Sequence, residues 1–268
     1  MSSEMSFAWD GRPDADKHVL VEQYADIGEP APDLSDGADR PFTVGAVTAR
    51  HDRALLGWGW VYEDHDGAAR VQTTYVPRFA RRIKTGHYDL LPPSAEEFEV
   101  MEGLYRRAVQ GARTAGYRTL RWSGPDTGPD GHAATALKAQ GHTEYARTWS
   151  AEPATWQPSA GLPEVQVEQL PEPGLTLATE NAEVSARIDG PTAYINAGEA
   201  IHHHAEPPAL AALLAELVTR LQRKHPEVTA LTIWEFDDAD TGLRQALSLA
   251  GLRITARHMT YELPLASP

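Results

Sequence analysis

Apolar residues recur along this chain with two periods, and each period predicts one type of element. Two segments space them three and four positions apart, which marks one face of a helix. The stripes are Phe98, Met101, Leu104, Tyr105, Ala108 and Val109, and Leu210, Leu213, Leu214, Leu217 and Leu221. Ser94 and Glu97 form a capping box before the first stripe, so that helix is expected to begin there.

Shorter apolar runs predict strands around both helices. Six runs form two sets of three, one set before each helix: residues 42–49, 54–62 and 70–76, then 175–179, 183–188 and 193–200. A further strand that ends in tryptophan follows each helix, over residues 117–122 and 228–234. Residues 10–40 mix Asp, Pro and Gly with few apolar anchors, and we expect irregular structure there.

The end of each half repeats at an offset of 110 residues. The first copy holds Ala136, Leu137, Gly141, Ala146, Arg147 and Glu152, and the second holds Ala246, Leu247, Gly251, Ala256, Arg257 and Glu262. Each copy reads as a short helix, a glycine at its end and a strand. We therefore expect an α/β protein of two domains, residues 1–155 and 156–268, which meet in the Pro-, Ala- and Gly-rich stretch 153–163.

Composition narrows the classes of partner. The net charge of −14 argues against nucleic acid, whose phosphates need a basic face, and favours a cationic ligand, although acidity also serves solubility. No apolar run approaches the length of a membrane span, and the N-terminus lacks the layout of a signal peptide, so we expect a cytoplasmic protein without membrane contact. The absence of cysteine excludes disulfides, thiolate metal sites and a cysteine nucleophile.

The duplicated order of elements resembles the GNAT superfamily of acyl-CoA-dependent N-acyltransferases. The closing segments 136–152 and 246–264 are most similar to the family's C-terminal pattern. This resemblance implies two tandem GNAT-like domains, each a mixed, mostly antiparallel sheet flanked by helices. It also implies acetyl-CoA or another acyl-CoA as co-substrate, a primary amine of a small, cationic metabolite or antibiotic as acceptor, and no metal.

In this family the fourth and fifth strands separate, and the pantetheine arm of acyl-CoA lies between them on the backbone of the fourth strand. The resemblance places these pairs at residues 71–76 with 119–123 and at 193–201 with 231–236. In the first half it implies that Tyr75 and Val76 contact the arm. A basic cluster follows, which either clamps phosphates or forms a solvated turn: Arg78, Arg81, Arg82 and Lys84, with Gly86.

The second half departs further from the family's glycine-rich phosphate loop. Its residues 202–209 contain no glycine, and Pro207 and Pro208 remove two N–H donors. We therefore expect the first half to bind acyl-CoA. The family's general-acid tyrosine is also replaced, by Leu137 and Leu247.

Three side chains in the second half are candidates for the catalytic base. His202 and His204 share one strand face and either accept a proton, ligate a metal or end an exposed strand. Glu235 follows a tryptophan at the end of a strand and is either a general base or a surface carboxylate.

Two other functions are compatible with this sequence. Erosion of both cofactor loops is compatible with a catalytically inactive binding or scaffold protein on the same fold. The acyl group also has a second possible source, a carrier protein.

Overall fold

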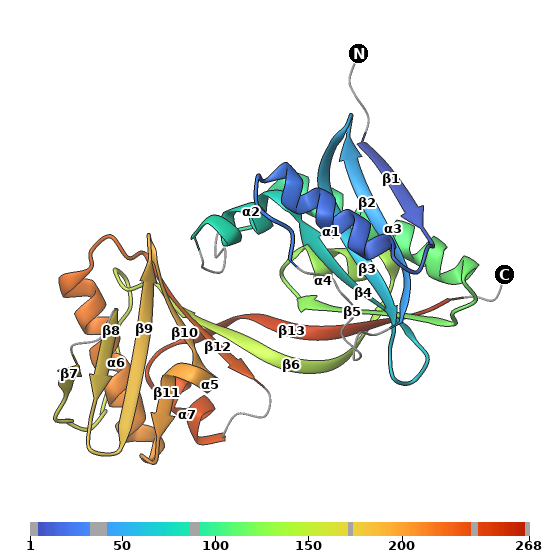
Figure 1. The fold of residues 1–268 in the computed structure, drawn as a ribbon. Coiled ribbons are helices and arrows are strands. Elements are labelled where there is room, and N and C mark those ends of the chain that lie inside the picture. Colours follow the sequence, from blue (N-terminus) through green and yellow to red (C-terminus); the bar gives the residue numbers. More distant parts are fainter. Residues whose placement is uncertain (1–4, 33–41, 86–91, 171–173, 237–240, 266–268) are drawn as a thin grey trace. The chain divides into compact units, whose positions relative to one another are not determined.

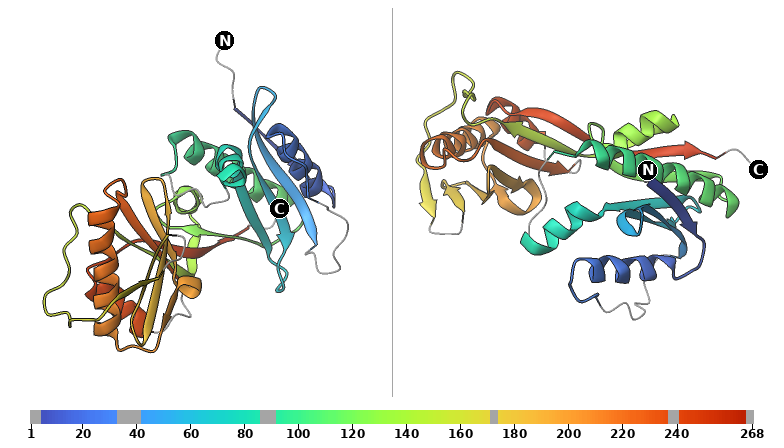
Figure 2. Two further views of the ribbon diagram at one scale, coloured as in Figure 1. Left: turned by 60° about the vertical axis from the view of Figure 1, so that its left-hand side comes forward. Right: turned by 90° about the horizontal axis from the view of Figure 1, so that it is seen from above.

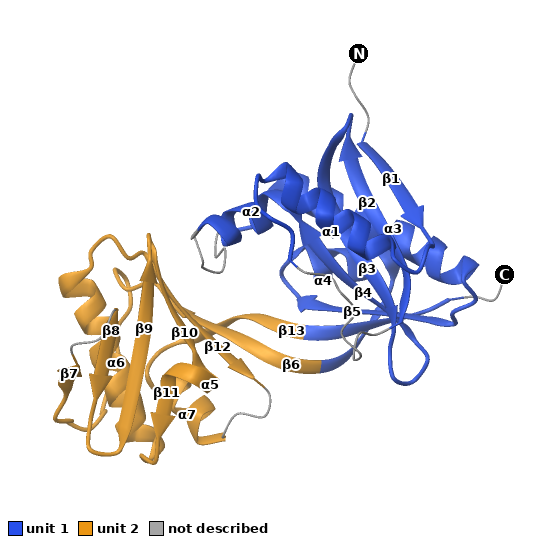
Figure 3. Cartoon of the chain, in the orientation of Figure 1, with its two compact units in different colours: residues 1–143, 259–268 blue, residues 144–258 orange. Residues whose placement is uncertain are grey.

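The computed structural model describes residues 5–32, 42–85, 92–170, 174–236 and 241–265. The chain divides into two compact units, residues 1–143 with 259–268 (unit 1) and residues 144–258 (unit 2) (Figure 3). These are not the contiguous halves 1–155 and 156–268, because two long strands change unit along their length. Strand β6 (Gln140–Ala151) starts in unit 1 and ends in unit 2, whereas β13 (Arg253–Pro264) starts in unit 2 and ends in unit 1.

Unit 1 holds the first nine elements of the chain and the end of β13 (Figure 1). In chain order they are β1 (Met5–Asp10), α1 (Ala15–Asp26), β2 (Thr43–His51), β3 (Ala54–Glu63), β4 (Ala69–Tyr75), α2 (Val76–Thr85), α3 (Ala95–Thr114), β5 (Thr119–Pro125) and α4 (Pro129–Leu137). The strands follow the order β1-β2-β3-β4-β5-β13 in the sheet. Neighbours from β1 to β4 are antiparallel, and β4 and β5 are parallel.

Helices α1 and α3 cover opposite faces of this sheet (Figure 2). Alternation along β3 sets the two faces, because successive residues of a strand point to opposite sides. Trp58 donates its indole hydrogen to Gln23 on α1, whereas a side chain at Gly57 would meet Val100 on α3. The Ser94 part of the capping prediction for α3 is confirmed, since the Ser94 hydroxyl accepts a hydrogen bond from the Glu97 backbone N–H at 3.1 Å, while the Glu97 side chain pairs with Arg78.

Helix α1 corrects the expectation of irregular structure for residues 15–26 of the stretch 10–40, of which residues 33–40 lie outside the described part of the chain. Its buried face carries two polar residues, Asp16 and Gln23, and this conceals the helical period in the sequence. Both side chains are hydrogen-bonded in the core: the Thr43 hydroxyl donates to Asp16 at 3.2 Å, and the Trp58 indole donates to Gln23 at 2.7 Å. Polar groups can be buried when they find such partners.

Unit 2 holds the end of β6 and the elements that follow it up to the start of β13. They are β7 (Glu168–Leu170), β8 (Leu175–Ala178), β9 (Ala182–Asp189), β10 (Thr192–Asn196), α5 (Ala197–Ala200), β11 (Ile201–His203), α6 (Pro207–Lys224), β12 (Ala230–Phe236) and α7 (Thr241–Leu249). The strand order is β13-β6-β12-β10-β9-β8-β7, and β11 also pairs with β9. The single strand expected over 193–200 is therefore interrupted by the helical turn α5.

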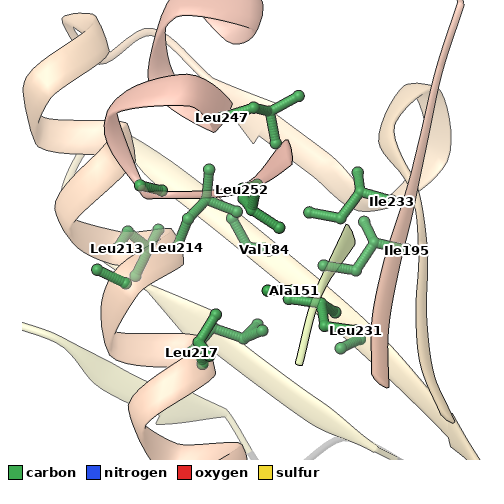
Figure 4. Close-up of a cluster of buried hydrophobic side chains, with 14 of the residues drawn as sticks. Ala151, Val184, Ile195, Leu213, Leu214, Leu217, Leu231, Ile233, Leu247 and Leu252 are labelled. Atoms are coloured by element: carbon green, nitrogen blue, oxygen red, sulfur yellow. The ribbon is translucent and has the colours of Figure 1, made fainter. Parts of the chain in front are cut away.

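The core of unit 2 forms between α6 and α7 and the inner face of the sheet (Figure 4). All five leucines of the predicted stripe on α6 are fully buried. Leu213, Leu214 and Leu217 lie in one cluster with Ile195 and Ile233. Burial of each such side chain contributes on the order of 1.5–3 kcal/mol, so this amphipathic stripe accounts for much of the packing.

The predicted fold class is confirmed. Both units follow the order of three antiparallel strands, a long helix, a strand, a short helix and a strand that the resemblance implied. Among the residues described above, no helix combines the length and apolar character that a membrane span requires.

Candidate functional site

In unit 1 the two parallel strands β4 and β5 separate soon after they meet. Their register places Ala69 opposite Leu120 and Arg70 opposite Arg121, and goes no further. On its other edge β4 stays paired with β3 as far as Tyr75. Beyond Arg70 the edge of β4 that faces β5 is therefore not paired with β5, as the resemblance implied. We call this unpaired stretch between the two strands the opening.

The corresponding strands of unit 2 remain together. Parallel β10 and β12 pair over five positions, from Thr192 opposite Ala230 to Asn196 opposite Trp234. The expected separation of residues 193–201 from 231–236 is thus wrong for residues 193–196. Ala193 and Ile195 are fully buried in the core, and this packing keeps the two strands closed.

Side chains bridge the opening of unit 1 where backbone pairing has stopped. On β4 the Thr73 hydroxyl lies 3.2 Å from the Tyr105 hydroxyl of α3. Tyr105 in turn donates to Asp130 Oδ1, near the start of α4, at 2.5 Å. The carboxyl group is packed against β5, since a Cβ on Gly124 would come within 2.2 Å of Asp130 Oδ2. Glycine at position 124 is therefore what admits this carboxyl group.

The environment of Asp130 changes its acidity. Burial raises the pKa of Asp130 to about 6, against the lowering effect of the Tyr105 hydrogen bond, and the nearby Glu97 charge raises it further. Burial disfavours the charged form of a carboxyl group, which is the main cause here. A carboxyl group of this pKa, at an opening in a sheet, is a candidate for proton transfer.

Trp122 lies in the core of unit 1, next to Tyr105. Its side chain is fully buried and packs between Tyr105 and Tyr261, with ring centroids 4.9 and 5.9 Å away. The indole N–H donates to the backbone carbonyl of Asp130 at 3.2 Å. Trp122 thereby fixes the start of α4 relative to β5.

The residues expected to contact acyl-CoA lie at the end of β4 and on α2. Tyr75 donates its hydroxyl hydrogen to Glu96 at 2.6 Å, and burial with this carboxylate raises the pKa of Tyr75 to about 12. Val76 is buried in the cluster between α1 and the sheet. Arg78 pairs with Glu97 in the first turn of α3, at 2.8 Å.

The remaining cations of the basic cluster are exposed on a helix, not on the turn considered for them. Arg81, Arg82 and Lys84 lie on α2, and the Arg82 guanidinium stands 5.3 Å from the ring centre of Phe79. Gly86 lies outside the described residues. The first turn of α3 carries Glu96 and Glu97, so a phosphate near that helix depends on the cations of α2 for compensation.

The proposed bases all lie in unit 2, and Glu235 is not at the surface. Its side chain is fully buried. Trp149 donates to Oε2 at 2.9 Å, Arg244 donates to Oε1 at 2.5 Å, and Arg147 stands 3.6 Å from Oε1. Both carboxylate oxygens therefore have partners within the fold, which suits a structural ion pair.

His202 and His204 are exposed beside β9. His202 stands opposite Glu183 in the register of β11, and the His204 backbone N–H donates to the Asn181 carbonyl at 2.8 Å. Within the described part of the chain, no group of three or more side chains is arranged to hold a metal ion. The role of His202 and His204 as a base stays a prediction.

Sequence reasoning missed the bridge of Thr73, Tyr105 and Asp130. The three residues are far apart in the chain and carry no shared motif. The one local signal is the run Gly128-Pro129-Asp130-Gly131, which places a carboxylate at a helix start directly after a strand. Leu137 and Leu247, at the position of the family's acid, pack into the two cores instead.

No family model matches the chain, and no curated protein sequence is detectably similar to it. Solved structures are similar over nearly its full length. A tandem GNAT protein from the clavulanic acid biosynthesis pathway is 15% identical with a TM-score of 0.47, covering 99% of this chain and 100% of its own. A GCN5-related N-acetyltransferase from Sphaerobacter thermophilus is 13% identical (TM-score 0.43; 98% and 96%). A GNAT-family acetyltransferase from Colwellia psychrerythraea is 9% identical (TM-score 0.47; 96% and 99%).

Proposed function

We propose that this protein transfers an acyl group, acetyl in the first instance, from acyl-CoA to a primary amine of a small cationic molecule. The observation that carries the proposal is the opening between β4 and β5 of unit 1. Amide groups of an extended pantetheine arm are matched by the unpaired backbone edge of a strand, which offers N–H and C=O groups at regular spacing. In unit 2 the corresponding strands β10 and β12 are paired over five positions, so that stretch of β10 has no unpaired edge toward β12.

The charges around the site are consistent with this assignment. Arg81, Arg82 and Lys84 are exposed cations on the helix that directly follows β4, where the phosphates of acyl-CoA would lie. The protein as a whole carries a net charge of −14, which favours approach of a cationic acceptor. In the reaction the amine attacks the thioester carbonyl carbon, and backbone N–H donors stabilise the resulting oxyanion. Direct attack requires no covalent enzyme intermediate.

The proposal is tested by binding. Acetyl-CoA should release or absorb heat in calorimetry and raise the thermal midpoint of the whole chain, because a ligand that binds only the folded state stabilises it by mass action. If millimolar acetyl-CoA produced no heat and no thermal shift, that result would contradict the proposal. That result would favour a binding or scaffold protein, or an acyl group delivered by a carrier protein.

The cations of α2 should contribute to this binding. We expect Arg81→Ala/Arg82→Ala to weaken acetyl-CoA binding about tenfold, since loss of charge-assisted contacts to phosphate costs about 1.4 kcal/mol or more. The thermal midpoint without ligand should not change, because both side chains are exposed. Arg223→Ala/Lys224→Ala is the matched control, since it also removes two exposed cations, from the end of α6 in unit 2. Equal affinities in both double variants would contradict a role of α2.

A further inference from the structure

We propose that Asp130 accepts a proton from the amine substrate in unit 1 and that Tyr105 is the residue that positions it. This inference rests on the proposed function, because the amine arrives as an ammonium ion and must lose a proton before it can attack. Unit 1 has to supply that acceptor beside its own opening. Leu137 cannot do so, because its side chain is a hydrocarbon.

The location of Asp130 is the first argument. Thr73, Tyr105 and Asp130 link β4, α3 and α4 just beyond the last paired residues, Arg70 and Arg121. The carboxyl group therefore lies where the two strands have separated. The residue as a whole is partly exposed, at the start of α4 directly after β5, while its carboxyl group is enclosed by Tyr105 and Gly124.

The way in which Asp130 is held is the second argument. Oδ1 receives the Tyr105 hydroxyl at 2.5 Å, and Gly124 gives the carboxyl group room against β5. The Trp122 indole fixes the Asp130 backbone carbonyl at 3.2 Å. Two elements, α3 and β5, thus fix the carboxyl group and backbone of one residue in place, and such fixed geometry is what proton transfer requires.

Burial first, then the Tyr105 hydrogen bond and the Glu97 charge, set the pH at which Asp130 acts. Tyr105 and Glu97 of α3 are the titratable groups that influence it, and Glu97 is itself paired with Arg78 of α2. With a pKa raised to about 6, Asp130 is ionised at neutral pH and ready to accept a proton. Turnover should therefore fall as the pH drops through about 6, because a protonated carboxyl group cannot act as base.

The reaction then balances as follows. The Asp130 carboxylate takes one proton from the ammonium group, and the freed nitrogen lone pair forms the C–N bond to the thioester carbonyl carbon. The carbonyl electron pair moves to oxygen and returns as the C–S bond breaks, so that the thiolate of CoA leaves with the bonding pair. Asp130 passes its proton to this thiolate, and the nitrogen releases its second proton to solvent, which yields amide and free thiol.

A pair of acceptors separates base catalysis from binding. Spermidine is cationic and must be deprotonated, whereas hydroxylamine is uncharged at neutral pH and needs no base. Released CoA can be followed with a thiol reagent without background, because the protein has no cysteine. We expect Asp130→Asn to lower turnover with spermidine about 100-fold or more, the usual range for loss of a general base. Turnover with hydroxylamine should fall much less than turnover with spermidine, and the affinity for acetyl-CoA should change by no more than about threefold.

Tyr105→Phe tests the positioning role by a pH profile. The Tyr105 hydrogen bond favours the charged form of Asp130, so its removal should shift the acidic limb of the profile to higher pH. Asp130→Asn should remove this limb altogether. Its amide oxygen still accepts from Tyr105, so folding should be retained, and an unchanged thermal midpoint checks this.

The outcomes separate the two proposals. A wild-type protein that neither binds acetyl-CoA nor releases CoA with either acceptor would overturn the proposed function, and this inference with it. A wild-type protein active with spermidine, together with an Asp130→Asn variant of equal activity and equal pH profile, would overturn the role of Asp130 alone. Loss of the acidic limb in His202→Ala/His204→Ala but not in Asp130→Asn would assign the base to the histidines.

Discussion

Replacing Trp122 with alanine should lower the free energy of unfolding by about 4 kcal/mol, the usual range for removal of a fully buried tryptophan. The side chain is 0% exposed and packs against Tyr105 and Tyr261. Its loss leaves a cavity between α3 and β5 and removes the indole donor to Asp130. Chemical denaturation followed by circular dichroism measures the effect.

The control for this variant is Phe42→Ala, which removes an aromatic ring that is 65% exposed. It should change the free energy of unfolding by no more than about 0.5 kcal/mol. A loss of under about 1 kcal/mol in Trp122→Ala would show that the region around the opening is not packed as described. Such a result would also weaken the case that Asp130 is held rigidly.

Glu235→Ala should destabilise the protein by about 3 kcal/mol or more, because removal of one partner from a buried ion pair leaves uncompensated charge and unsatisfied donors. Arg244, Arg147 and the Trp149 indole would all lose their shared acceptor. The exposed Glu164→Ala in the same unit should stay within about 0.5 kcal/mol of wild type. Denaturation curves of the two variants measure the difference.

This variant also decides between the two interpretations of Glu235. A catalytic base at the surface would cost turnover and leave stability unchanged. A structural carboxylate costs stability, and turnover falls only as the folded fraction falls. An unfolding midpoint equal to that of wild type, with turnover lost, would return Glu235 to the list of catalytic candidates.

The regular spacing of apolar residues made the two long helices, α3 and α6, predictable. Their apolar stripes are buried because each stripe has a sheet to pack on, and local capping by Ser94 fixes the start of α3. The internal repeat located α4 and α7 with the strands that follow them. It could not indicate that β13 would end in unit 1, because strand partners are chosen by the fold and not by sequence order.

Other features have no local signal. Helix α1 was not predicted because Asp16 and Gln23 occupy its buried face. The four-residue turn α5 breaks an apolar run that reads as one strand. In both segments tertiary partners override the pattern that the sequence alone presents.

The candidate site was predictable only in part. The separation of β4 from β5 followed from the resemblance, and the register of unit 1 agrees with it. The same reasoning failed for residues 193–196, where buried Ala193 and Ile195 hold β10 against β12. Asp130 was not predicted, since its altered pKa depends on Tyr105 and on burial, and both arise only once the chain has folded.

A crystal structure of the protein with bound CoA tests the central claim most directly. The account predicts density for the pantetheine arm in unit 1, along the unpaired edge of β4 at Thr73–Tyr75 that faces β5. Density along β10 and β12 of unit 2, with phosphates over Pro207 and Pro208 at the start of α6, would contradict it.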